Sequence, residues 1–205
     1  FSIHDNSGWY IPVEYPEKIN SIFDEFGLDL ILKKLSSLFE NAKYKFCGQN
    51  IKYDALVLSR YGVALNGIEF DTMVAAHLIR PESGRFKMDY LSIEFLNYHM
   101  KPITDLIGTG KNQKSMRDIP VKQVTNYASE DADLSLQLKH VFDKELESNG
   151  VKAVFYDIET PIINVLSDME KEGINIDSSY LNQLEQEFEK DLNKLKEEIY
   201  NQSGE

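Results

Sequence analysis

The feature that most constrains the fold is the alternation of short apolar runs with helix-like segments in the first half of the chain. Lys45-Phe46-Cys47-Gly48 is expected to form a short buried strand, and Ile68–Phe70 a second one. A helix is expected between them over residues 52–61, and another over Met73–Ile79 with Asp71 as its N-cap. Strands that alternate with helices predict an α/β fold with a mixed sheet flanked by helices.

Three further segments carry local structural signals. Phe1–His4 and Trp9–Val13 are β-prone runs on either side of Asn6-Ser7-Gly8, a pattern that predicts a β-hairpin. Apolar residues at helical spacing predict an amphipathic helix over Leu28–Phe39. A long helix is expected over residues 121–147, and we place a domain boundary after it, at residue 150, which separates a domain over 1–150 from a helical segment over 151–205.

The helical segment has its own pattern. A helix is expected over residues 155–172, around Pro161, and Gly173 ends it. Beyond it, apolar residues recur every three or four positions and form one seam along a charged helix. Such a seam requires a packing partner, either more of the same polypeptide or a second copy of the chain. The seam residues are Leu181, Leu184, Phe188, Leu192, Leu195 and Ile199.

Composition bounds the class of protein. The chain has 205 residues, and its single cysteine excludes a disulfide framework and a cysteine zinc site. The single cysteine fits a reducing compartment, so we expect a cytoplasmic protein. We expect no membrane partner, because no apolar run is long enough to span a bilayer. The net charge of −12 argues only weakly against a nucleic-acid partner, since residues 155–205 alone hold 13 acidic and 4 basic side chains.

The first candidate cluster of functional side chains lies at the start of the helix after the first strand. Asn50 and Asp54 are four residues apart, so both lie on one helix face near the carboxyl end of that strand. Ligands bind at this edge in open α/β sheets. The alternative is purely structural: Asn50 caps the helix and Asp54 interacts favourably with its N-terminal dipole.

The second candidate cluster lies within the long helix. Tyr127 and Asp131 are again four residues apart, which places a phenol beside a carboxylate that could orient a metal-bound water. Asp133 lies near the opposite face and is expected to be a solvated or capping acid, whereas Glu130 is ambiguous. The alternative for this run of acids is an ordinary solvated surface.

Together, the two clusters resemble known motifs. Gly48–Asp54 (GQNIKYD) and Tyr127–Asp133 (YASEDAD) resemble the second and third motifs of the 3′–5′ exonucleases with a DEDD active site and a tyrosine in the third motif. The connecting segments are similar to the proofreading domain of the bacterial DNA polymerase I family, and Ile158–Asp177 resembles the opening of its polymerase domain. These connecting segments are Phe70–Met73, Gly84-Arg85, Met88–Leu91, Gly108–Gln113 and Leu134–Leu138.

The resemblance implies a ribonuclease H-like domain, followed by the first thumb helices of a polymerase, that hydrolyses DNA from its 3′ end with two Mg²⁺ or Mn²⁺ ions. By motif position, Asp131 would be a direct metal ligand, Asp54 would help to hold the second ion, and Tyr127 would hydrogen-bond the attacking water. Partners would be a single-stranded DNA 3′ end, primer-template DNA and the rest of the polymerase chain. The residues expected to contact DNA are Gln49, Asn50 and Arg85, with Lys111, Lys114 and Arg117 in a basic loop that could equally be a solvated surface.

One departure from the family pattern bears on activity. The family's first motif, Asp-x-Glu, supplies two more metal ligands, and no such pair precedes Trp9. We interpret this as a truncated first strand and expect the 205-residue chain to be weakly active or inactive. Two other functions stay open: a ribonuclease D-like RNA exonuclease, which the polymerase-like segments disfavour, and a catalytically silent scaffold or single-stranded DNA-binding domain, which the retained motif acids disfavour.

Overall fold

The predicted alternation of strands and helices is present in the computed structural model, which describes residues 1–13 and 27–204. Two strands pair in parallel, with Cys47 opposite Phe70 and Gly48 opposite Asp71. The connection between them runs through a helix, as parallel pairing requires. These elements are β1 (Phe46–Gly48), α2 (Ile51–Ser59), β2 (Ile68–Asp71) and α3 (Thr72–Ile79).

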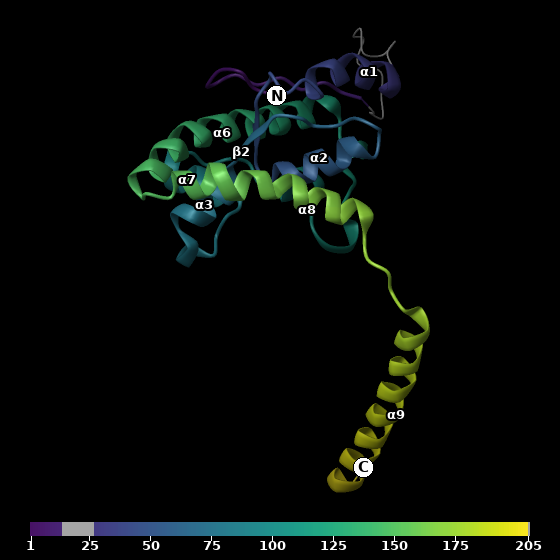
Figure 1. Cartoon of the computed structure of the whole chain (residues 1–205). Helices are drawn as coiled ribbons and strands as arrows, with labels where there is room; N and C mark the ends of the chain where they lie inside the picture. Colours follow the sequence, from purple (N-terminus) through teal and green to yellow (C-terminus); the bar gives the residue numbers. More distant parts are fainter. Residues whose placement is uncertain (14–26, 205) are drawn as a thin grey trace. The chain divides into compact units, whose positions relative to one another are not determined.

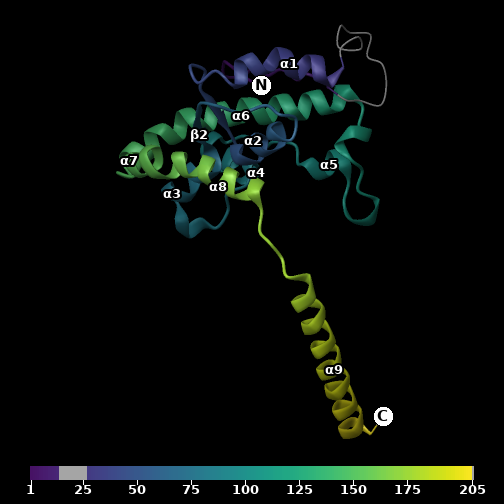
Figure 2. The same cartoon turned by 45° about the vertical axis from the view of Figure 1, so that its right-hand side comes forward.

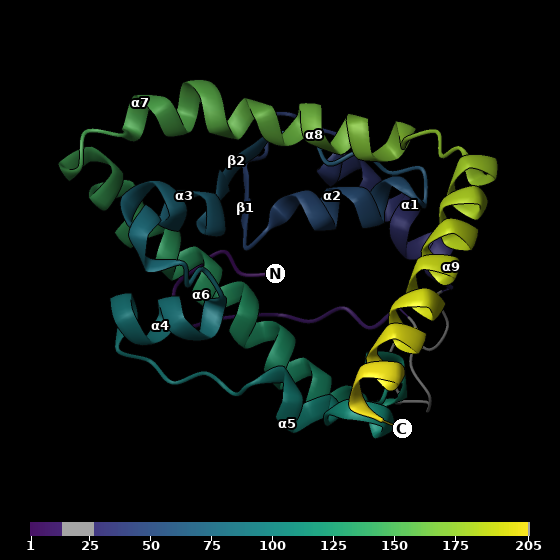
Figure 3. The ribbon, with the colours of Figure 1, turned by 90° about the horizontal axis from the view of Figure 1, so that it is seen from below.

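A long helix, α6 (Val121–Ser148), organises the core around this unit. It packs against α3, which Figure 1 labels, and against α4 (Met88–Leu96), which lies beside it in Figure 3. Phe70 from β2 and Leu138 and Phe142 from α6 are completely buried in the main hydrophobic cluster. The long helix, which carries the predicted Tyr127–Asp131 cluster, also contacts β1, the strand that leads into α2.

The remaining elements of this part of the chain are short or peripheral. The predicted helix over Leu28–Phe39 is confirmed as α1. Helix α5 lies beside the N-terminal end of α6 (Figure 2). A smaller hydrophobic cluster, which includes Ile107 and Val124, joins the two helices. The basic loop contains two short 3₁₀ turns. These elements are α5 (Ile103–Ile107), η2 (Pro81–Ser83), η3 (Gly110–Asn112) and η4 (Met116–Asp118).

The prediction of an N-terminal β-hairpin is wrong. Over residues 1–13 the structure shows no strand; one reciprocal pair of backbone hydrogen bonds joins Phe1 and Trp9, whose rings stack at 5.4 Å. Gly8 instead contacts α6, because a Cβ atom at this position would lie 2.3 Å from the carbonyl oxygen of Ser129. The backbone N–H of Ser7 also donates to Asp133 on α6, so the segment follows this helix rather than a sheet.

The sheet is smaller than predicted. Within residues 1–13 and 27–204 it has two strands, both parallel, where the sequence predicts a mixed sheet. The chain is therefore mixed α/β but mostly helical. In the same ranges, no helix is both long and apolar enough to cross a membrane.

The chain divides into two compact units, Phe1–Asp168 and Met169–Glu205. The first unit includes α7 (Lys152–Val154), a π-helical turn, η5 (Phe155–Glu159), and most of α8 (Thr160–Glu172). The predicted helix around Pro161 is thus interrupted by a π turn, as expected near a residue that cannot donate a backbone hydrogen bond. The domain boundary predicted at residue 150 stays a prediction. The first compact unit extends past that residue, to Asp168.

Phe155 and Tyr156 attach this segment to the core of the first unit. The Phe155 side chain is 0% exposed and its ring lies 4.6 Å from that of Phe70. The Tyr156 hydroxyl donates to Asp143 on α6 at 2.8 Å, and Lys152 forms an ion pair with the same carboxylate.

The second unit consists of the end of α8 and one long helix, α9 (Ser178–Ser203). The side chain of Asp177 caps α9 by accepting from the backbone N–H of Tyr180 at 3.0 Å. The predicted apolar seam lies on its surface, where the Phe188 side chain is 66% exposed. Within the second unit, as far as the structure describes it, nothing packs against this seam.

Candidate active site

The first turn of α2 presents the first predicted cluster. Asn50 occupies the N-cap position in a left-handed conformation, with φ of 56°, and its side chain makes no capping hydrogen bond. The structural alternative for Asn50, a side-chain cap, is therefore wrong. The cap comes instead from Asp71, which accepts from the backbone N–H groups of Asn50 and Ile51 at 3.1 and 2.8 Å.

Asp54 lies in the first turn of α2 and faces an open cavity, which leaves its side chain exposed to solvent. The surrounding protein walls still remove much of its hydration. This desolvation, together with the negative charge of Asp71, raises the pKa of Asp54 to about 6. A carboxylate held in this environment is suited to pairing with a cation.

The second predicted cluster has the geometry expected from its spacing on α6. The Tyr127 hydroxyl hydrogen-bonds the half-buried Asp131 carboxylate. Burial raises the pKa of Asp131 to about 6, and the tyrosine hydrogen bond offsets part of this rise. Burial and the neighbouring Asp131 charge raise the pKa of Tyr127 to about 12, so the phenol stays protonated at neutral pH.

The two clusters meet in space. Asp54, Tyr127 and Asp131 all line one cavity of about 700 Å³ between β1, α2 and α6. Tyr127 and Asp131 also line a neighbouring cavity of about 450 Å³, together with Arg117 from the basic loop. Two carboxylates with raised pKa values and a protonated phenol at one cavity are a chemically coherent site for a hydrated divalent cation.

The acids beside Asp131 have other roles. Glu130 accepts hydrogen bonds from the Tyr98 hydroxyl at 2.6 Å and from the backbone of Lys101, so it anchors the segment after α4. Asp133 accepts from the backbone of Ser7 and from Gln137. Neither is a simple solvated acid. Over the described ranges, no group of three or more histidine, cysteine, aspartate or glutamate side chains is arranged to hold a metal ion.

The other residues predicted to contact DNA are distributed around α2, α4 and the basic loop. Gln49 is half-buried and donates to the carbonyl oxygen of Phe86 at 2.7 Å. The Arg85 guanidinium lies over the Tyr90 ring, 5.3 Å from its centroid. Lys111 and Lys114 are exposed. Arg117 is the loop base that shares a cavity with the site, and the DNA contacts of all these residues stay predictions.

Sequence reasoning missed the double role of Asp71. It predicted a cap for α3, and the Asp71 carboxylate does accept from the backbone N–H groups of Met73 and Val74. The bonds to α2 depend on the pairing of Gly48 with Asp71, which brings the end of β2 beside the start of α2. The signal that could have found them is the position of both residues at the carboxyl ends of adjacent parallel strands.

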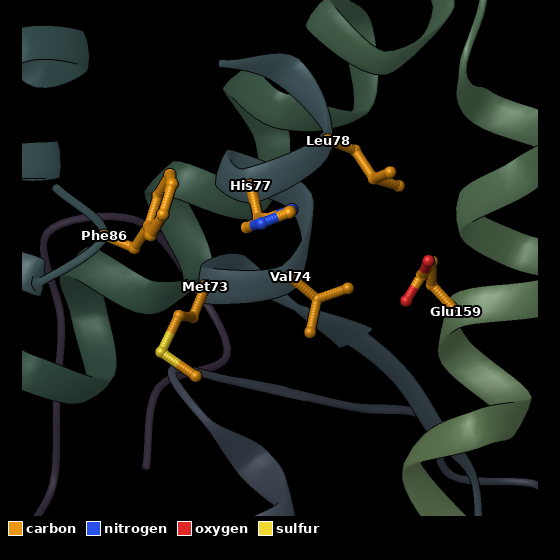
Figure 4. Close-up of a pocket in the computed structure, with 6 residues that line it drawn as sticks. All are labelled: Met73, Val74, His77, Leu78, Phe86 and Glu159. Atoms are coloured by element: carbon orange, nitrogen blue, oxygen red, sulfur yellow. The ribbon is translucent and has the colours of Figure 1, made fainter. Parts of the chain in front are cut away.

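A third, smaller cavity of about 240 Å³ lies beside α3 (Figure 4). Met73, Val74 and Leu78 make its walls mostly apolar, and His77 packs against Phe86 with ring centroids 5.2 Å apart. The Glu159 side chain faces it from the π turn. Of the described residues predicted to act in the site, none lines this cavity.

Comparison with known proteins identifies the family. The family model described as 3′–5′ exonuclease, from the DNA polymerase A class, matches residues 1–147. The chain belongs to this 3′–5′ exonuclease family. Similar relatives include DNA polymerase I of Rhizobium leguminosarum, 34% identical over 85% of this chain and 17% of the relative. DNA polymerase I of Chloroflexus aurantiacus is 33% identical over 95% of this chain and 20% of the relative.

The similarity to DNA polymerase I extends beyond the exonuclease family model. DNA polymerase I of Pseudomonas aeruginosa is 28% identical over 100% of this chain, including the segment after residue 147. This chain spans about a fifth of the length of the curated polymerases that it matches. The chain is therefore an exonuclease-family segment related to one part of a much longer polymerase.

Solved structures show the same fold. The POL domain of Pol1 from M. smegmatis, in complex with DNA primer-template and dNTP, has a TM-score of 0.66 over 82% of this chain and 26% of that one, at 24% identity. Brucella melitensis NrnC has a TM-score of 0.55 over 68% of this chain and 64% of its own, at 18% identity. The exonuclease-family fold is thus retained where sequence identity is low.

Proposed function

We propose that this chain is part of a proofreading nuclease that removes nucleotides from the 3′ end of DNA, within a cytoplasmic bacterial DNA polymerase I. The proposal includes a ribonuclease H-like fold with a mixed sheet. The observation that carries it is the convergence of Asp54, Tyr127 and Asp131 on one cavity from two helices far apart in the sequence.

Asp54 and Asp131 are the residues that would hold a divalent cation. Both are carboxylates, the ligand type that Mg²⁺ and Mn²⁺ prefer, and Mg²⁺ is commonly bound through one or two carboxylates with water and substrate phosphate completing its shell. Their raised pKa values support the assignment, because a bound cation would offset the cost of ionising both. When bound, such an ion lowers the pKa of a coordinated water and neutralises charge on the phosphate.

Tyr127 would orient the attacking water rather than deprotonate it. Its pKa of about 12 keeps the hydroxyl protonated, so it acts as a hydrogen-bonding group at neutral pH. The water oxygen attacks the phosphorus of the last phosphodiester and releases a proton to solvent, the bond from phosphorus to the 3′ oxygen breaks, and that oxygen takes up a proton from solvent. Gln49, Asn50, Arg85, Lys111, Lys114 and Arg117 would hold the DNA strand, with the loop bases contacting its phosphates.

A catalytically silent scaffold is the second candidate function. It is favoured by one observation: over residues 1–13 and 27–204, no three potential ligands are arranged for a metal ion. Because two carboxylates line the cavity among the residues that the structure describes, we expect the isolated chain to be weakly active or inactive. We also propose that the exposed α9 seam packs against the rest of a polymerase, or against a second copy when the chain is isolated.

The test uses a chimera in which this chain replaces the matching segment of the P. aeruginosa polymerase. The chimera and its Asp131→Ala variant are incubated with 5′-labelled single-stranded DNA and Mg²⁺, and retained polymerase activity shows that each is folded. Stepwise shortening from the 3′ end that disappears in the variant supports the proposal. Intact DNA with both folded proteins would favour the scaffold. Shortening of a matched RNA but not of the DNA would favour an RNA exonuclease.

A further inference from the structure

Asp71 connects the ends of two helices. Its side chain is 1% exposed, and its two oxygens accept four backbone hydrogen bonds. Oδ1 accepts from Met73 and Val74 of its own helix, α3, at 2.9 and 3.3 Å. Oδ1 also accepts from Asn50 at 3.1 Å, and Oδ2 accepts from Ile51 at 2.8 Å, both at the start of α2.

The bonds to α2 exceed what a cap of α3 requires. An aspartate N-cap ordinarily satisfies the free N–H groups of the helix that follows it. Here α2 has no side-chain cap of its own, and Asn50 adopts a left-handed conformation that presents the N–H groups of Asn50 and Ile51 to Asp71. The start of α2 is therefore fixed by a residue 20 positions after Ile51 in the sequence.

Thr72 and Gln49 make further hydrogen bonds at the segment between β1 and α2. The Thr72 hydroxyl lies 3.2 Å from the carbonyl oxygen of Gly48 and also donates to the Gln49 side-chain oxygen. The Gln49 amide in turn donates to Phe86. Asp54 lies on the first turn of α2, directly after this fixed segment, and faces the cavity that it shares with Tyr127 and Asp131.

We propose that Asp71 is a positioning residue that fixes the first turn of α2 and thereby directs Asp54 toward the metal-binding cavity. The inference rests on the proposed function, because it assumes that Asp54 helps to hold a cation. Residues that orient metal ligands commonly change metal affinity by about 10- to 100-fold when they are replaced. The competing explanation is that Asp71 only stabilises the fold as a cap of α3.

Asp71→Ser separates the two explanations. Serine is also a good N-cap, so it can still accept from the N–H groups at the start of α3, but its shorter side chain does not reach α2. The matched control is Asp177→Ser, which changes another aspartate N-cap that bonds to a single helix, α9. If Asp71→Ser does not fold, Asp71→Asn replaces it. Asparagine keeps one acceptor oxygen for α3, but its NH₂ group would face the Ile51 N–H, and two donors cannot form a hydrogen bond.

The experiment measures amide hydrogen exchange and Mn²⁺ affinity in the full 205-residue chain. For Asp71→Ser, we expect the Ile51 amide to exchange roughly 10- to 100-fold faster, because it loses a hydrogen bond to a charged carboxylate. The Val74 amide should remain protected. The Mn²⁺ dissociation constant should rise at least about tenfold. Asp177→Ser should change neither the Ile51 amide nor the Mn²⁺ affinity.

The outcomes distinguish a failure of this inference from a failure of the proposed function. If Asp71→Ser leaves the Mn²⁺ affinity unchanged, or weakens it no more than Asp177→Ser does, Asp71 is only a structural cap and the inference is wrong. An Asp54→Asn variant tests the assumption beneath it. If that variant binds Mn²⁺ as tightly as the wild type, the metal role of Asp54 fails, whatever Asp71 does to the α2 amides.

Discussion

Replacing Asp131 with asparagine should stabilise the folded chain at neutral and alkaline pH. Asp131 has a pKa of about 6 in the folded protein, mainly because burial disfavours its charge, whereas an unfolded aspartate titrates near 3.9. The folded state therefore binds the proton more tightly than the unfolded state does. It follows that the wild-type carboxylate lowers stability as the pH rises from about 4 to 6, and that the loss is complete above that window.

The size of the effect follows from the same two values. A difference of about 2 pKa units corresponds to about 3 kcal/mol at pH 8, and at pH 4.5 to about a third of that figure. Because Asp131 is only half-buried, we expect solvent screening to reduce the measured gain to about 2 kcal/mol at pH 8. Asparagine keeps an oxygen that accepts from the Tyr127 hydroxyl, so this hydrogen bond should survive the substitution.

The assay is urea denaturation of the wild type and Asp131→Asn at pH 8 and pH 4.5, without divalent cations. Asp105→Asn, which removes the charge of an exposed acid in α5, controls for the change in net charge. A gain at pH 8 that shrinks at pH 4.5, and is absent in Asp105→Asn, supports the reasoning. Equal stability of the wild type and Asp131→Asn at pH 8, or a gain that does not depend on pH, would refute it.

Three further predictions concern the metal, the core and the N-terminal segment. Mg²⁺ at ten times its dissociation constant should stabilise the wild type by about 1.4 kcal/mol but leave Asp131→Asn unchanged, as followed by thermal denaturation. Phe155→Ala should cost about 3–5 kcal/mol in urea denaturation, whereas Ile158→Ala, on the exposed side of the same turn, should cost far less. Gly8→Ala should cost about 1–3 kcal/mol and speed amide exchange over residues 1–10, because its Cβ would lie 2.3 Å from the Ser129 carbonyl oxygen.

The sequence predicts the local parts of the site well. The spacing of Tyr127 and Asp131 on one helix is enough to place a phenol beside a carboxylate, because neighbours four residues apart share a helix face. The helix over Leu28–Phe39 and the cap of α3 are likewise encoded within a few residues. The convergence of Asp54 with Asp131 is not local, and only the resemblance to a known family indicated it.

The failures are the features that depend on distant contacts. The hairpin pattern over residues 1–13 is real, but Gly8 and Ser7 contact α6, and these contacts replace strand pairing. The cap of α2 by Asp71 requires the register in which Gly48 pairs with Asp71, and sequence spacing does not specify a register. Asn50 shows the same limit, since its residue type favours a side-chain cap that the structure does not use.

The burial of Phe155 has a consequence for how this exonuclease-family segment could be exchanged between related chains. If two related chains were fused at residue 150, Phe155 would be separated from Phe70, and Tyr156 from Asp143. Each of these residues would then face a side chain from the other chain, against which it does not pack as well. A joint after Asp168 keeps these pairs together. Natural or engineered transfer of this segment should therefore keep the helical turns over residues 151–168 together with residues 1–150, as one inherited unit.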